Sequence, residues 1–99
     1  MATPYRVNLT TESAGHLKEI FEYIERDSPQ NASRVIERLL AAVFSLEQLP
    51  HRYVRNTAKV GAEVRSMPVP PFLVRYHVDD GPRVVTILSV RHGARRPER

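Results

Sequence analysis

The sequence contains no cysteine, which excludes a disulfide framework, thiolate chemistry and a cysteine-based zinc site. It also lacks long apolar runs, because the longest unbroken ones span only a few residues and are too short for a transmembrane helix. Residues 1–5 contain neither the basic nor the apolar region of a secretory signal peptide. We therefore expect a cytoplasmic protein with no membrane partner.

Lysine is scarce in the second half of the chain, where Lys59 is the only one. Residues 1–49 hold 5 Lys and Arg against 7 Asp and Glu, a net charge of −2, whereas residues 50–99 hold 10 against 4, a net charge of +6. The basic half is therefore dominated by arginine, whose planar guanidinium suits bidentate binding of phosphate or carboxylate. This distribution favours a surface that meets a polyanion or an acidic partner, although a solubilising arginine-rich surface has the same composition.

The 99 residues predict one domain with a modest core. Residues 5–9 alternate between apolar and polar side chains, which is typical of a strand. Either Thr10 or Thr11 is a suitable N-cap for the helix that follows. Apolar side chains then recur every three or four residues, so this helix is predicted to end near Asp27.

A second helix is predicted to begin at Ser28-Pro29, where a hydroxyl N-cap precedes proline at the first helical position. Its broad apolar face continues to Leu49, and Pro50 stops it. The connection between the two helices is only a few residues long, so we expect an antiparallel helical hairpin.

The remaining chain is predicted to form strands after a surface loop over residues 50–62. A short strand covers residues 64–67, a cleanly alternating strand covers residues 72–78, and a strand apolar on both sides covers residues 84–90. Short turns between these strands favour antiparallel pairing. The predicted fold class is α+β, with an N-terminal strand and a two-helix hairpin packed on a mainly antiparallel sheet of about four strands.

A basic sheet face is the main candidate for a functional surface. Arg75 and His77 project from one side of their strand, opposite the apolar side chains Phe72, Val74, Tyr76 and Val78. We expect Arg65, from the neighbouring strand, and the segment at residues 91–96 to converge on the same face. An ordinary solvated sheet face explains the same pattern, and this alternative stays open.

Metal-ligand patterns are absent. The four histidines are His16, His51, His77 and His92, and none of them forms an H-x-x-x-H or H-E-x-x-H spacing. We therefore expect no metal site and no cofactor. His16 falls on the polar side of the first helix and His51 in a loop, so both are predicted to be surface residues.

Several motifs, spread over nearly the whole chain, together resemble one family. They are Leu17-x-x-Ile20-x-x-Tyr23-Ile24, Ser28-Pro29-x-x-Ala32, Leu46-x-x-Leu49-Pro50, Val64-Arg65-x-Met67-x-Val69, Phe72-x-Val74-x-Tyr76-x-Val78 and Val90-x-His92-Gly93-x-Arg95. In this order they resemble the RelE/ParE superfamily of toxins from bacterial type II toxin–antitoxin modules. The resemblance implies a single toxin domain over residues 1–99 and a cognate antitoxin partner that contacts the helical hairpin and a sheet edge.

The superfamily has two branches: RelE-like mRNA interferases, which cleave codons in the ribosomal A site, and ParE-like poisons of DNA gyrase. The interferase branch commonly carries an arginine where this sequence has Leu73, and a C-terminal tyrosine where nothing aromatic follows Tyr76. The Ser28-Pro29 start and the ending at His92 look more like ParE. The resemblance therefore implies a toxin that binds DNA gyrase. The alternatives are a ribosome-dependent endoribonuclease that acts on mRNA and, third, a non-toxic member that only binds its antitoxin.

The residues expected to contact the target share positive charge or an imidazole. They are Arg65, Arg75, His77, Arg91, His92, Arg95 and Arg96. If the protein is an endoribonuclease, the resemblance leaves Arg65, Arg75, His92 and Arg95 as a relocated catalytic set. Residues 97–99 are predicted to be a solvated tail.

Overall fold

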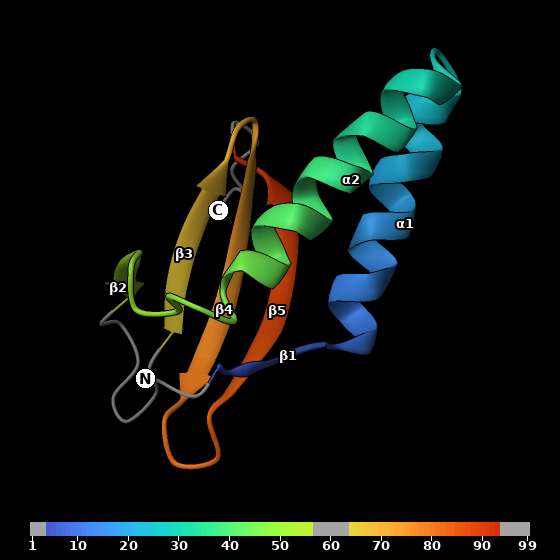
Figure 1. Cartoon of the computed structure of the whole chain (residues 1–99). Coiled ribbons are helices and arrows are strands. Elements are labelled where there is room, and N and C mark those ends of the chain that lie inside the picture. Colours follow the sequence, from blue (N-terminus) through green and yellow to red (C-terminus); the bar gives the residue numbers. More distant parts are fainter. Residues whose placement is uncertain (1–3, 57–63, 94–99) are drawn as a thin grey trace.

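The computed structural model describes residues 4–56 and 64–93. In chain order the elements are β1 (Arg6–Leu9), α1 (Thr11–Glu25), α2 (Pro29–Ser45), β2 (Val54–Asn56), β3 (Val64–Val69), β4 (Phe72–Asp79) and β5 (Val84–His92). The strands form one sheet in the order β1-β5-β4-β3-β2. The two helices lie on one side of this sheet, and their connecting turn reaches beyond its end (Figure 1).

The sheet is mixed because β1 pairs with β5 in parallel, whereas all the other pairs are antiparallel. The expected loop over residues 50–62 is wrong in part, since β2 lies within it and pairs with β3. A strand of three residues is too short to show a period of two, so its sequence gives no signal.

Helix α1 is fixed to the sheet at its first turn by Thr10. The hydroxyl oxygen of Thr10 accepts a hydrogen bond from the Ser13 amide at 3.0 Å, so Thr10 is the N-cap. The same hydroxyl donates to the carbonyl oxygen of Ile87 on β5 at 2.8 Å. One side chain therefore starts the helix and anchors it to the sheet.

Helix α2 begins as predicted, with Ser28 as the N-cap that accepts from the Asn31 amide and with Pro29 as its first residue. It ends at Ser45, before the predicted end at Leu49. The next three amides bond to carbonyl groups only three residues back, so the last turn tightens and leaves the α-helical path. Leu49 is consequently 59% exposed rather than buried.

The core lies between the helices and the sheet face that they cover. β4 contributes the four apolar side chains that the alternation predicted, and its partner β5 contributes Val85, Ile87 and Val90. A β-bulge places Tyr76 opposite Ile87 and Arg75 opposite Ser89. Because one extra residue sits in β5, Ile87 and Val90 both face the core although they are three residues apart.

Candidate functional site

The sheet face away from the helices carries the exposed cations of β4 and β5. Arg75 lies between Ser66 on β3 and Ser89 on β5, and it is exposed. Arg91 is exposed next to the half-buried Leu73. We call this surface, made of the outward residues of β1, β3, β4 and β5, the open face.

The open face is basic along most of its length. His77 lies opposite Thr86 and is half-buried. Arg6 on β1 lies opposite Val84 of β5 and is exposed. Among the described strand residues, Asp79 is the one carboxylate on this face, and it lies at the end of β4. Guanidinium and imidazole groups held on strands suit the binding of phosphate or carboxylate groups.

Arg65 does not join the open face, so the expected convergence with Arg75 is wrong. In the β3–β4 register Arg65 lies opposite Tyr76, on the side that the helices cover. Its guanidinium Nη1 donates to the carbonyl oxygens of Tyr53 at 2.7 Å and His51 at 3.2 Å. The buried Tyr76 hydroxyl donates to the carbonyl oxygen of Pro50 at 2.7 Å. Arg65 and Tyr76 together hold the loop that follows α2.

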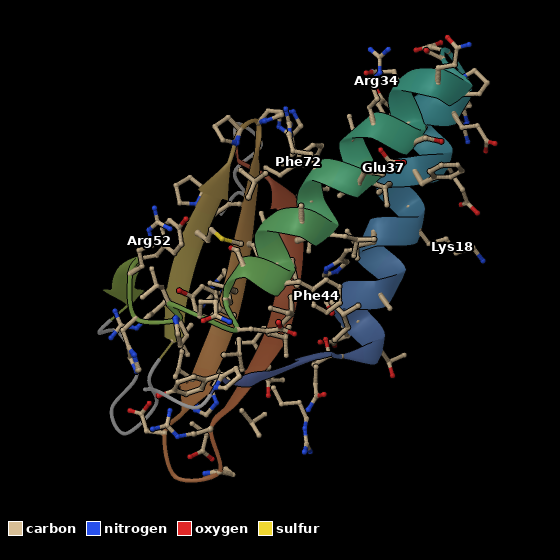
Figure 2. All side chains as sticks on the ribbon, viewed as in Figure 1. Lys18, Arg34, Glu37, Phe44, Arg52 and Phe72 are labelled. Carbon is tan, nitrogen blue, oxygen red and sulfur yellow. The ribbon has the colours of Figure 1, made fainter. Side chains whose placement is uncertain are left out.

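His92 also faces the helices, and the expectation that it lies with Arg75 is wrong. It lies opposite Phe72 on β4, and the two rings meet edge to face with centroids 5.6 Å apart. Figure 2 places Phe72 at the end of the sheet, beside α2. His92 and Arg91 therefore project to opposite sides of β5.

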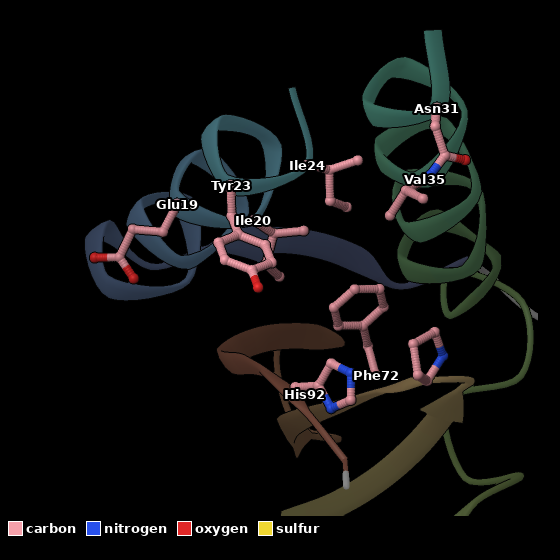
Figure 3. Close-up of a pocket in the computed structure, with 9 residues that line it drawn as sticks. Glu19, Ile20, Tyr23, Ile24, Asn31, Val35, Phe72 and His92 are labelled. Atoms are coloured by element: carbon pink, nitrogen blue, oxygen red, sulfur yellow. The ribbon is translucent and has the colours of Figure 1, made fainter. Parts of the chain in front are cut away.

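An apolar groove of about 560 Å³ opens between the outer half of the helical hairpin and this end of the sheet. His92 and Phe72 form its floor, while Ile20, Tyr23 and Ile24 line it from α1 (Figure 3). Its other lining residues are Glu19, Asn31, Val35 and Pro71. Tyr23 is 69% exposed, which is unusual for an aromatic side chain on an apolar helix face.

Gly93 closes the described part of the chain beside this groove. Its amide donates to the carbonyl oxygen of Pro71 at 2.7 Å, and a Cβ at this position would lie only 3.2 Å from that oxygen. Glycine thus permits the close approach that fixes the end of β5 against the start of β4. Arg95 and Arg96 lie outside the described residues.

A polar cluster that the sequence did not reveal joins three distant segments. The Tyr5 hydroxyl donates to Asp80 Oδ1 at 2.6 Å, and His51 Nε2 lies 2.9 Å from the same oxygen. The hydrogen bond from Tyr5, with the nearby His51 and Arg83, holds the pKa of Asp80 below its usual value. The cluster ties the N-terminal segment and the loop after α2 to the β4–β5 turn.

His16 is not a plain surface residue, contrary to the expectation from the helix pattern. It is half-buried, and its Nδ1 accepts a hydrogen bond from the Val90 amide of β5 at 3.2 Å. A sequence pattern that sorts residues by polarity places histidine on the outer face of a helix, so it misses this contact.

The described residues contain no group of three or more His, Cys, Asp or Glu side chains that could hold a metal ion. Over the same part of the chain, neither helix has the length and apolar character needed to cross a membrane.

Comparison with known proteins identifies the family. A family model described as the ParE toxin of type II toxin–antitoxin systems, parDE, matches residues 7–97. The chain is 38% identical to toxin RelE2 of Caulobacter vibrioides over 86 residues. This aligned stretch covers 87% of this chain and 92% of that protein. The chain therefore belongs to the ParE toxin family, within the RelE/ParE superfamily of type II toxins.

Two solved structures share its fold. A chain of the chromosomal ParDE system from P. aeruginosa matches with a TM-score of 0.72 and 18% identity, over 92% of this chain and 98% of that one. A chain of the toxin–antitoxin complex RelBE2 from Mycobacterium tuberculosis matches with a TM-score of 0.69 and 24% identity, over 90% and 98%. The predicted α+β class, a helical hairpin on a mainly antiparallel sheet, is confirmed.

Proposed function

We propose that this toxin arrests growth by binding DNA gyrase through its open face. The observation that carries the proposal is that an apolar residue, Leu73, lies beside Arg91 on this face. Leu73 lies opposite Arg91 on this face, at the position where the interferase branch commonly has an arginine. An apolar, half-buried side chain there removes one cation from the place where a scissile phosphate would need charge stabilisation.

The remaining groups on the open face suit binding better than cleavage. Arg75, Arg91 and Arg6 are permanent cations at neutral pH, and each is exposed on a rigid strand. Such groups form charge-assisted hydrogen bonds with carboxylates or with DNA phosphates of a gyrase–DNA complex. The family description, ParE toxin of parDE, supports the same branch.

The deciding experiment compares two assays of the purified full chain. We expect it to inhibit supercoiling by gyrase or to stabilise cleaved DNA, and to leave mRNA on programmed ribosomes intact. Cuts at codon positions in that mRNA, with unaffected supercoiling, would reverse the assignment. If neither activity appears while the protein still binds its antitoxin, the chain is a non-toxic member of the family.

Ribosome-dependent mRNA cleavage is the second candidate, and two observations favour it. His77 lies two residues from Arg75 on the same face, which pairs a titratable imidazole with a fixed cation. The relative from Caulobacter vibrioides is named toxin RelE2. Under this alternative, His77→Gln should abolish codon-position cuts, whereas under gyrase binding it should reduce inhibition only partly.

We further propose that a cognate antitoxin neutralises the toxin by occupying the apolar groove. The solved relatives are described as toxin–antitoxin systems or complexes, which supports a partner of this kind. The groove offers apolar walls and an exposed Tyr23, which favours a partner segment that carries apolar anchors.

A charged substitution at the groove tests this site. Tyr23→Glu should weaken antitoxin binding by at least about tenfold, because it places a carboxylate at the centre of an apolar contact. Tyr23 is already exposed, so the fold should survive, and Arg75→Ala on the open face is the matched control that should bind normally. Undiminished binding by Tyr23→Glu would place the antitoxin elsewhere.

A further inference from the structure

One edge of β5 loses its strand partner partway along. β1 pairs with β5 from Arg6 opposite Val84 to Leu9 opposite Ile87, and the chain then turns into α1. β5 itself continues to His92. From residue 88 onward, the edge of β5 that faced β1 therefore has no partner strand among the described residues.

His16 of α1 takes the place of the missing strand. The Val90 amide donates to His16 Nδ1 at 3.2 Å, and the imidazole is half-buried between α1 and β5. A backbone amide is always a donor, so Nδ1 must carry a lone pair and a neutral ring must carry its proton on Nε2. An imidazolium has a proton on both nitrogens and cannot accept this hydrogen bond.

This contact sits next to the apolar groove. Ile20, one helical turn after His16, lines the groove from α1. His92, two residues after Val90, lines it from β5. The hydrogen bond between His16 and Val90 thus joins the element that forms this groove wall to the strand that carries His92 of the groove floor.

We infer that protonation of His16 breaks this hydrogen bond and loosens α1 from β5, so that the shape of the groove responds to pH. The consequence for antitoxin binding rests on the proposed docking site, whereas the structural switch does not. Acidification is expected to weaken the binding of a partner that fits the groove at neutral pH, because α1 and β5 are then no longer held at a fixed separation.

Other charged groups lie on the elements packed around His16. They are Glu12, Lys18, Glu19, Glu22 and Glu25 on α1, Arg34, Glu37 and Arg38 on α2, Arg6 on β1, and Arg91 and His92 on β5. Of these, only His92 belongs to the residue type that normally changes charge between about pH 5 and pH 8. It is therefore the residue that the experiment must control for.

The test measures hydrogen-exchange protection of the Val90 amide in the ¹⁵N-labelled full chain by NMR. Between about pH 8 and pH 5 we expect protection in the wild type to fall about tenfold, as for the loss of one hydrogen bond. His16→Asn, whose side-chain oxygen accepts at any pH, should keep its protection constant. His92→Gln should behave like the wild type.

A second measurement needs no variant: the imidazole ¹⁵N shifts of His16 at about pH 8 should show an unprotonated, hydrogen-bonded Nδ1. Val90 protection that stays constant between about pH 8 and pH 5, or an equal loss in His16→Asn, would overturn the inference. Because neither readout requires toxicity or an antitoxin, failure here leaves the gyrase and antitoxin proposals standing. Conversely, failure of those proposals leaves this switch standing.

Discussion

At the scale of single residues, three arginines of the basic half do three different things. The guanidinium of Arg65 holds two loop carbonyl groups, that of Arg75 is exposed on the open face, and that of Arg83 lies 5.2 Å from the centre of the Tyr5 ring. Net charge does not separate these roles, because each depends on which side of a strand or turn the residue occupies. Arg65 is therefore better regarded as a structural residue than as a contact to the target.

The substitution Arg65→Ala should lower the free energy of unfolding by about 1–3 kcal/mol, because two carbonyl groups lose their charged donor. The matched substitution Arg75→Ala should change it by less than about 0.5 kcal/mol. Thermal melts of both variants beside a growth assay check this. An unchanged melting temperature for Arg65→Ala with complete loss of toxicity would return Arg65 to the target surface.

Asp80 makes acid stability depend on Tyr5. Its pKa is lowered in the folded protein, first by the hydrogen bond from Tyr5, so its contribution to stability exists above the ordinary aspartate pKa and is lost as pH falls through the folded value. Tyr5→Phe should raise the pKa of Asp80 towards that ordinary value and flatten the loss of stability in acid. NMR titration of the Asp80 carboxyl group measures this, and superimposable curves for the two proteins would contradict it.

At the scale of elements, the sequence predicts helices better than the side of the sheet on which a residue lies. Ser28-Pro29 marks the start of α2 because capping is local chemistry. Val64 and Met67 are both apolar and both buried, yet they are three residues apart and lie on opposite sides of a regular strand. Pairing with β4 shows which one faces the helices, since Met67 lies opposite Val74 and Val64 lies opposite His77.

Strand register, which the sequence does not reveal, also explains why Arg65 and His92 do not lie on the open face. The register that puts Met67 in the core also puts Arg65 on the helix side, and pairing with Phe72 puts His92 there. The placement of Arg75 and His77 on the open face was predictable from alternation along β4, whereas Arg91 reaches it only because the bulge shifts the alternation of β5 after Ile87. The bulge in β5 has no sequence signal of this kind, because it arises from pairing with β4.

The Thr10 hydroxyl joins two elements, and its loss should be felt by both. Thr10→Val keeps the shape of the side chain but removes the N-cap acceptor and the donor to Ile87, so it should cost about 1–2 kcal/mol of stability. Thr11→Val is the matched control, because Thr11 is exposed in the first turn of α1. Chemical denaturation of both variants provides the measurement, and equal midpoints would refute the double role.

At the scale of the whole molecule, charge is divided between two layers. Helices α1 and α2 together carry five Asp or Glu residues against three Lys or Arg, and Figure 2 shows Lys18, Arg34 and Glu37 on the hairpin. The open face carries Arg6, Arg75 and Arg91. The asymmetry that the sequence shows between its halves thus becomes an asymmetry between the two sides of the sheet, with the groove opening on the helical side.

The central claim is that toxicity is exerted by the open face. Charge reversal tests it most directly: Arg75→Glu should abolish growth arrest when the protein is expressed without its antitoxin, because a carboxylate would repel the anionic groups that we propose this face binds. Arg34→Glu, an equal change of charge on an exposed α2 residue, should still arrest growth, and both variants should melt like the wild type. Full growth arrest by a well-folded Arg75→Glu protein would contradict the account.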